Sequence, residues 1–253
     1  MEMRVPEGQS IQQTMPGTQA GAPRTFRYLD LVMVAFVVVL ICSNLIGPAK
    51  AAVIDLPGWG PFIFGAGVLF FPISYIFGDI LTEVYGYARA RKVIWAGFAA
   101  MIFASIMAFV VVALPPAPAW PNQKAYEIAF GNTWRIAGAS MIAYWFGEFF
   151  NSYVLAKLKV RTEGKQMGLR FVASTFASEF VDSLLFYPLA FYNSGIMPNE
   201  LVFTIMWSQF GLKTLVEIVL LPLTFVIVKA LKRAENVDYF DRDTNFTPFS
   251  MKT

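Results

Sequence analysis

Residues 93–114 read VIWAGFAAMIFASIMAFVVVAL, a stretch without a single charged side chain. A helix needs about 20 residues to cross the hydrocarbon core of a bilayer. Backbone groups cannot remain unpaired in lipid, so an apolar stretch of this length predicts a transmembrane helix. Residues 31–49 and 56–78 also lack charged side chains. The sequence therefore predicts an all-α protein that crosses a membrane several times.

The composition of the whole chain agrees with this prediction. Its 253 residues are 57% hydrophobic and 15% charged, with a mean hydropathy of +0.54, whereas soluble domains are about a quarter charged. The chain has no histidine, which excludes imidazole catalysis and histidine-based zinc sites. Cys42 is the only cysteine and lies inside an apolar stretch, so no internal disulfide can form. No cofactor or metal is expected.

Six apolar stretches are expected to form spanning helices. They cover residues 28–47, the stretch after Pro57 as far as GDILTEVYG (78–86), and residues 93–114, 136–156, 171–192 and 202–229. The second stretch contains Pro61, Pro72 and several glycines, so its helix is expected to be broken or to begin only near Gly65. Residues 1–27 are expected to form a disordered tail, residues 28–232 a six-helix transmembrane domain, and residues 233–253 a second tail.

Basic residues test the count of spans, because Lys and Arg accumulate in cytoplasmic loops. They cluster before the first stretch and after the second, fourth and sixth: Arg4, Arg24 and Arg27; Arg89, Arg91 and Lys92; Lys157, Lys159, Arg161, Lys165 and Arg170; Lys229, Lys232 and Arg233. The alternate loops contain only Lys50, Lys124 and Arg135. Six spans with both termini in the cytoplasm fit this pattern.

The apolar stretches also contain polar residues, and a charge at the centre of a membrane helix costs at least about 2.5–3.5 kcal/mol. The candidate substrate-binding residues are Asn44, Asp79, Glu83, Glu148, Glu179, Asp182, Gln209, Lys213 and Glu217. Helical spacing places Asp79 with Glu83, Glu179 with Asp182, and Gln209 with Lys213 and Glu217 on common faces. An excess of acids on several helices favours a polar cavity near the midplane.

Each group also has a purely structural interpretation. Lys213 and Glu217 could pair with each other at i, i+4, and Glu148 could be a contact between helices. Asp79 and Glu83 could lie at the interface and bind Arg89 or Arg91. Glu179 and Asp182 have no nearby cation on their own stretch, so Lys213 is their expected counter-charge. Aromatic residues such as Tyr75, Tyr85, Phe186, Tyr187 and Trp207 are candidates to stack on a planar ligand.

Three segments carry a resemblance to a known family. FPISYIFGDILTEVYGYARARKVIW (71–95), SEFVDSLLFYPLAF (178–191) and QFGLKTLVEIVLLP (209–222) resemble the queuosine precursor transporter family, also called vitamin uptake transporters. The resemblance covers about residues 28–232. It implies a six-spanning protein of the bacterial inner membrane that imports 7-deazaguanine bases (preQ0, preQ1 or queuine) for tRNA modification.

The resemblance also implies a fold similar to the substrate-binding subunits of energy-coupling-factor transporters. Those subunits often dock their partner through an A-x-x-x-A motif, which the first stretch lacks, and this favours a stand-alone carrier. The expected partners are a small-molecule substrate and the lipid bilayer, without nucleic acid. A homodimer and the energy source are left open.

The residue types suit such a base. A 7-deazaguanine presents N1–H and an exocyclic amine side by side, and one carboxylate can accept both. Its carbonyl needs a donor such as Lys213, Asn44 or Gln209. The same lining would suit another purine-like or vitamin-like solute. Two further hypotheses are an intramembrane enzyme and an assembly subunit, although the chain has no histidine and no G-x-S-x-G motif to support an enzyme.

Overall fold

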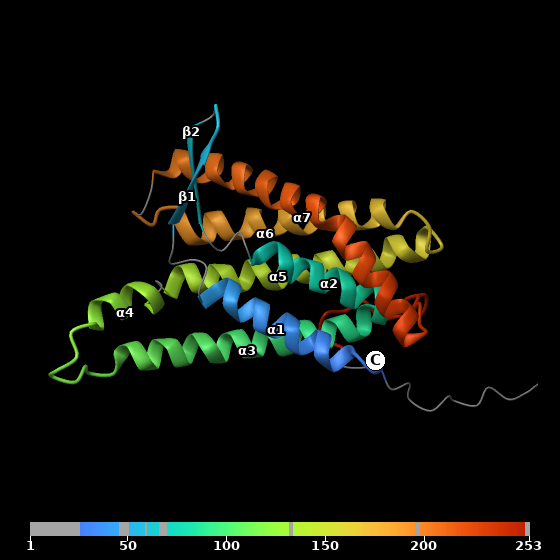
Figure 1. Ribbon diagram of the computed structural model, residues 1–253, viewed down its shortest axis with the longest axis horizontal. Coiled ribbons are helices and arrows are strands. Elements are labelled where there is room, and N and C mark those ends of the chain that lie inside the picture. The colour runs from blue at the N-terminus through green and yellow to red at the C-terminus, as the bar shows by residue number, and fades with distance from the viewer. Residues whose placement is uncertain are drawn as a thin grey trace, which may run out of the picture.

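The computed structural model describes residues 26–45, 51–58, 60–65, 70–131, 134–195 and 198–250. Helices make up most of this part of the chain (Figure 1). In chain order the elements are α1 (Leu29–Leu45), β1 (Ala51–Leu56), β2 (Gly60–Gly65), α2 (Phe71–Tyr85), α3 (Tyr87–Ala113), α4 (Gln123–Phe130), α5 (Trp134–Arg161), α6 (Met167–Phe191) and α7 (Asn199–Glu235).

Helix α2 lies at the centre of the bundle. It packs against α1, α3, α5 and α7, and nearly all of its residues from Ser74 to Tyr85 are buried. Pro72 falls in its first turn, where a missing backbone N–H breaks no helical hydrogen bond. Because α2 is almost completely enclosed, most of its polar side chains depend on neighbouring helices for their partners.

Six helices, α1, α2, α3, α5, α6 and α7, lie at the six apolar stretches that the sequence predicts to be helical, although α2 covers only the later part of the second stretch. Among the described helices, α3 and α7 are both long and apolar enough to cross a membrane. Helix α1 is apolar but shorter, and α5 and α6 carry several charged residues. The count of six spans therefore remains a prediction.

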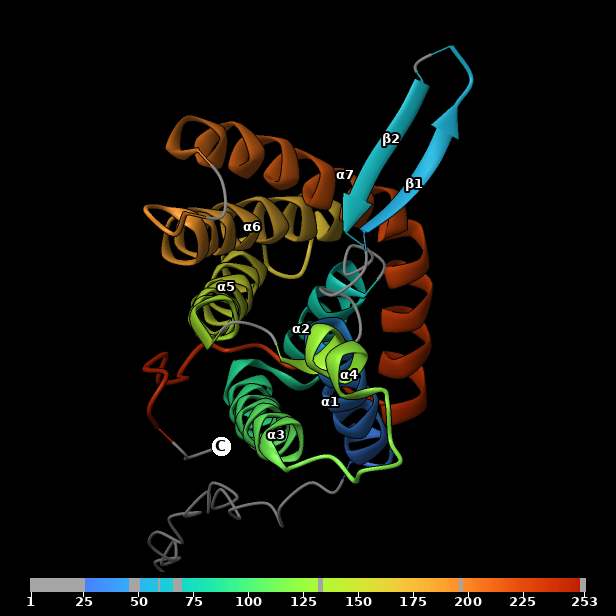
Figure 2. The same ribbon diagram turned by 90° about the vertical axis from the view of Figure 1, so that its left-hand side faces the viewer.

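An antiparallel hairpin departs from the all-α prediction. Strands β1 and β2 pair from Ala51 with Gly65 to Leu56 with Gly60, and the hairpin projects away from the helices (Figure 2). Pro57 and Gly58 form its turn, where Gly58 has a φ of +84°. Pro61 and the flanking glycines disfavour a helix here, so α2 begins only at Phe71. The expected helix start near Gly65 is therefore too early.

Helix α7 changes direction along its length. Its first part lies on α6 and its later part lies beside α2 (Figures 1 and 2). Pro222 inside the helix is a physical cause, because proline lacks the N–H that would bond the carbonyl one turn earlier. The bend allows one helix to contribute side chains at two levels of the bundle.

The segment after α7 is docked along the bundle. We call residues 237–250 the C-terminal strap. Asp241 accepts hydrogen bonds from the backbone N–H of Tyr87 with both carboxylate oxygens, at 3.1 and 3.0 Å, and thereby caps the start of α3. Farther along the strap, Arg91 donates to two strap carbonyls and Trp95 to a third. Most of the expected first tail lies outside the described residues, but the N–H groups of Arg27 and Tyr28 bond Glu235.

Gly86 separates α2 from α3 and has a φ of +87°. A Cβ added there would lie 2.2 Å from Cδ1 of Tyr239 on the strap. The position therefore requires glycine twice, for its backbone conformation and for the close approach of the strap.

We predict that Gly86→Ala lowers the free energy of unfolding by about 2 kcal/mol or more, because backbone strain and overlap with Tyr239 add together. Thermal unfolding in detergent measures the effect. Gly195→Ala is the matched control, since Gly195 has a φ of +75° but nothing within 4 Å of an added Cβ. Equal losses in the two variants would show that the strap does not press on Gly86.

Candidate functional site

Polar side chains gather inside the bundle where α2, α5, α6 and α7 meet. The candidate residues buried there are Asp79, Glu148, Glu179, Asp182, Lys213 and Glu217. Buried with them are Tyr75 on α2, which the sequence suggests as an aromatic that could stack on a ligand, and Asn151 on α5, which was not among the expected binding residues. We call these eight residues the central polar cluster.

Lys213 is the cation of this cluster. Its ammonium lies 2.6 Å from Oδ2 of Asp182 and 3.4 Å from Oε2 of Glu179. The two acids are three residues apart on α6, so one face of that helix presents both to α7. The expected counter-charge of Glu179 and Asp182 is thus present, and the alternative pairing of Lys213 with Glu217 is not the one formed.

The contact of α2 with α5 is equally close. Asn151 donates to Oδ1 of Asp79 at 2.7 Å. One turn earlier on α5, the carboxyl of Glu148 packs directly on Gly78, where an added Cβ would lie 1.7 Å from Oε1. The hydroxyl of Tyr75 lies against Gly147, whose other neighbours include Asp182. Small residues on α2 and α5 therefore let polar groups from three helices approach one another.

Several buried oxygens in the central polar cluster accept no hydrogen bond from the described residues. They are both carboxylate oxygens of Glu148 and Glu179, Oε1 of Glu217 and Oδ1 of Asn151. The hydroxyls of Tyr75, Ser183 and Thr214 are also without a partner there. Buried polar atoms are usually satisfied, so such a concentration requires an explanation. The arrangement is suited to a ligand rich in N–H donors.

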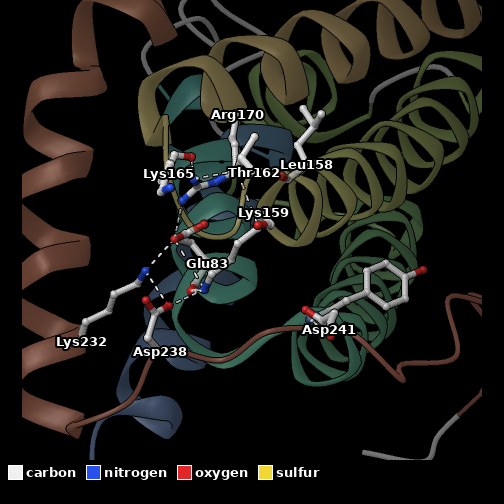
Figure 3. Close-up of polar contacts among 10 residues, drawn as sticks. Glu83, Leu158, Lys159, Thr162, Lys165, Arg170, Lys232, Asp238 and Asp241 are labelled. Atoms are coloured by element: carbon white, nitrogen blue, oxygen red, sulfur yellow. Dashed lines mark hydrogen bonds and ion pairs between the residues drawn. The ribbon is translucent and has the colours of Figure 1, made fainter.

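Glu83 lies in different surroundings, although it is only one turn from Asp79 on α2. Its Oε1 contacts three cations: Lys232 at 2.6 Å, Arg170 at 2.8 Å and Lys159 at 3.5 Å. Figure 3 shows these side chains converging from α5, α6 and α7. We call Glu83 and its three cations, together with Asp238, the basic-end cluster. The suggested interfacial partners Arg89 and Arg91 instead bond Tyr85 and strap carbonyls.

Asp238 connects the strap to this cluster. Its Oδ1 lies 2.6 Å from Lys159 and 2.8 Å from Lys232 (Figure 3). Burial works against its charge, but hydrogen bonds from the two lysines hold the pKa of Asp238 below its usual value. The link is therefore present near neutral pH and is lost only when pH falls through that lowered pKa.

Asn44 and Gln209 are not brought into either cluster by any contact in the described structure. Asn44 accepts a hydrogen bond from Ser140 at 2.7 Å and donates to the carbonyl of Leu40, so it connects α1 with α5. Gln209 is partly exposed on α7. Helical spacing places Gln209 on the same face of α7 as Lys213, one turn nearer the start of the helix.

Some of the aromatic residues suggested for ligand stacking lie inside the bundle and others do not. Tyr75 and Tyr187 are buried, and the ammonium of Lys213 lies 5.2 Å from the ring centre of Phe71. Tyr85 instead donates to Glu235, and Trp207 is exposed. Within the described part of the chain, no group of three acids or cysteines is placed to hold a metal ion.

Sequence reasoning missed how the basic residues act. It counted Lys159, Arg170 and Lys232 only as loop charges, yet Lys159 and Arg170 are almost completely buried. Asp238 was assigned to a tail. The sequence did contain a signal for this cluster. Glu83 is an acid that needs a cation, and the basic residues that follow the second, fourth and sixth predicted spans lie on the same side of the membrane as Glu83 in the six-span prediction.

Comparisons with known proteins agree on one family. The model of a family described as a putative vitamin uptake transporter matches residues 65–227. A probable queuosine precursor transporter of Bacillus subtilis (strain 168) is 30% identical over 158 residues, which cover 62% of this chain and 68% of that protein. The queuosine precursor transporter of Escherichia coli (strain K12) is 27% identical over 176 residues, 68% of this chain and 73% of that protein.

A third relative, a probable queuosine precursor transporter of Haemophilus influenzae, is 27% identical over 150 residues, or 57% of each chain. No solved structure matches the chain.

We predict that Gly78→Ala displaces the Glu148 carboxyl and lowers the free energy of unfolding by about 1–3 kcal/mol, the usual cost of overpacking a tight interior. Thermal unfolding in detergent measures the loss. Gly211→Ala on α7 is the control, because nothing lies within 4 Å of an added Cβ there. It should be neutral or stabilising by up to about 1 kcal/mol. Equal behaviour of the two variants would contradict the contact of Glu148 with Gly78.

We predict that Arg170→Met destabilises the fold by about 3 kcal/mol, near the lower end for breaking a buried ion pair, since two lysines remain beside Glu83. Exposed Arg161 on the preceding helix is the control, and Arg161→Ala should change the free energy of unfolding by no more than about 0.5 kcal/mol. A double variant, Glu83→Gln with Arg170→Met, should lose less than the sum of the two single losses. Strict additivity would show that the two side chains do not interact.

Proposed function

The chain belongs to the family of putative vitamin uptake transporters, and we propose that it imports a 7-deazaguanine base, a queuosine precursor, across a bacterial inner membrane. Three relatives named as queuosine precursor transporters or probable ones support this substrate class. Their names also fit a carrier rather than an enzyme. The protein is thus a membrane transporter, and its particular substrate, preQ0, preQ1 or queuine, is the subject of the proposal.

One observation supports the substrate most directly: buried carboxylate oxygens of the central polar cluster lack hydrogen-bond donors. The edge of a 7-deazaguanine offers N1–H and an exocyclic amine, which one carboxylate can accept as a pair. Glu179 and Glu217 have free buried oxygens on adjacent helices. We propose that one of these two carboxylates accepts the donor pair.

The other features of the base suit neighbouring groups. An ammonium has three N–H donors, and Lys213 uses a short one toward Asp182, so another can bond the carbonyl of the base. Phe71, beneath the same ammonium, and buried Tyr75 are proposed to contact the flat face of the ring. Asp79 completes the proposed site from α2. Asn44, Glu83 and Gln209 lie outside the central polar cluster, so the proposed site does not include them.

We also propose six membrane spans, formed by α1, α2, α3, α5, α6 and α7, with both termini in the cytoplasm. Supporting this orientation, Lys159, Arg170 and Lys232 meet around Glu83 at the end of the bundle where the strap lies (Figure 3), in agreement with the positive-inside rule. The short helix α4 and the hairpin lie toward the opposite end (Figure 1). A resemblance to the substrate-binding subunits of energy-coupling-factor transporters remains part of the proposal.

The experiment that tests the function is restoration of queuosine in tRNA. Bacteria that lack both precursor synthesis and uptake are given the chain together with preQ0 or preQ1, and tRNA queuosine is measured. We expect restoration by the wild-type chain. Asp182→Asn should reduce initial uptake at least about tenfold, because it removes a charge-assisted bond worth about 1.5–3 kcal/mol that positions Lys213.

Asp243→Asn is the matched control, since Asp243 is exposed on the strap, and it should retain wild-type uptake. Failure of well-expressed, membrane-inserted wild-type protein to restore queuosine would refute the substrate. Wild-type uptake by Asp182→Asn would refute the proposed site while leaving the substrate in place. Excess guanine or adenine added as a competitor separates a 7-deazaguanine carrier from a general purine carrier.

A further inference from the structure

Glu148 is the buried acid that the proposed substrate contacts do not use. It lies in the interior of α5 and its side chain is 0% exposed. The carboxyl packs on the backbone of Gly78, because an added Cβ would meet Oε1 at 1.7 Å and the carboxyl carbon at 2.8 Å. The contact occurs where α2 meets α5, so any separation of these two helices would change the surroundings of Glu148.

No group in the described structure compensates a charge on Glu148. Neither carboxylate oxygen accepts a hydrogen bond. The titratable groups that interact with it are all acids or phenols: Tyr75 and Asp79 on α2, Glu179 on α6, and Tyr144 on its own helix. Lys213, the cation of the central polar cluster, is paired with Asp182 and Glu179.

Most of the other buried acids have a partner; the exception is Glu217, whose Oε1 accepts no hydrogen bond from the described residues. Within the described residues, Asp79 has Asn151, Glu83 has three cations, and Glu179 and Asp182 have Lys213. Asp241 caps α3. An unpaired buried charge costs several kcal/mol, whereas a protonated carboxyl removes the charge. Protonation would therefore remove the cost of burying Glu148 without a counter-charge.

We propose that Glu148 is a proton-carrying residue and that the inward movement of the base is coupled to the inward movement of a proton. This inference rests on the proposed function. Glu148 takes up the proton from the outer solution and is buried against Gly78 with it. When α2 and α5 separate on the inner side, water stabilises the carboxylate and the proton leaves to the cytoplasm. The balance needs one proton from outside for each proton released inside, and a proton gradient supplies it.

The test uses the full chain reconstituted in vesicles, with labelled preQ1 or preQ0 outside and a pH gradient imposed, acid outside. We expect the gradient to raise accumulation by wild-type protein at least fivefold over equal pH, and a protonophore to abolish the increase. Glu148→Gln keeps the shape but cannot release a proton, so it should reach only the equilibrium level with or without the gradient. Glu148→Asp retains a carboxyl and should keep part of the response.

Glu200→Gln is the matched control, because Glu200 is exposed at the start of α7, and it should respond like wild-type protein. Uptake by wild-type protein that is equal with and without the gradient would refute the coupling and leave the proposed function intact. Absence of uptake under every condition would refute the proposed function and, with it, the coupling.

A second measurement does not depend on transport. Infrared spectra of purified protein at neutral pH should contain the carbonyl band of a protonated, buried carboxyl. Glu148→Gln should weaken this band, whereas Glu200→Gln should leave it as in wild-type protein, and any part that remains in Glu148→Gln belongs to another buried acid such as Glu217. If no such band is present, or if Glu148→Gln leaves it unchanged, Glu148 does not hold the proton and the proposal is wrong. Retention of equilibrium uptake by Glu148→Gln shows that the variant is folded, so its loss of coupling would arise from proton chemistry.

Discussion

Oε1 of Glu83 is the point at which separate parts of this bundle are joined. It holds Lys159 of α5, Arg170 of α6 and Lys232 of α7, while Glu83 itself belongs to the central helix α2. Asp238 shares two of these cations and so brings the strap into the same network. Removing a carboxylate from water is costly unless good counter-charges surround it. The positions of these helix ends therefore depend on keeping the charges together.

The same helices carry a second level of polar groups with the opposite balance of charge. Around Glu83, cations outnumber acids, whereas in the central polar cluster Lys213 serves several acids and some oxygens have no donor. Three cations hold Glu83 in one arrangement, although its Oε2 accepts no hydrogen bond from the described residues. The excess of acids in the central polar cluster leaves capacity for a ligand or a proton, as the proposed carrier function requires.

Much of the fold followed from local sequence. Uncharged stretches predicted where six helices lie, because hydropathy and helix length are local properties. The hairpin was missed because its residues are as apolar as those of a spanning helix, although Pro57, Gly58 and Pro61 disfavour a helix there.

At the site, the excess of acids predicted a need for Lys213. The sequence indicated that Glu83 needs cations but not which ones, because Lys232 lies 149 residues away and only the bend and packing of α7 bring it near.

The basic-end cluster also has a consequence for biosynthesis. The ribosome completes α2, with Glu83, before it makes any of the three cations or the strap. In the proposed six-span arrangement, α2 enters the membrane before the partners of Glu83 exist, so the carboxyl must stay in the headgroup region or be protonated. Helices α5, α6 and α7 then deliver one counter-ion each. The final position of α2 is therefore reached only after α7 has been made. In this arrangement α2 is the second span to be synthesised but one of the last to become fixed.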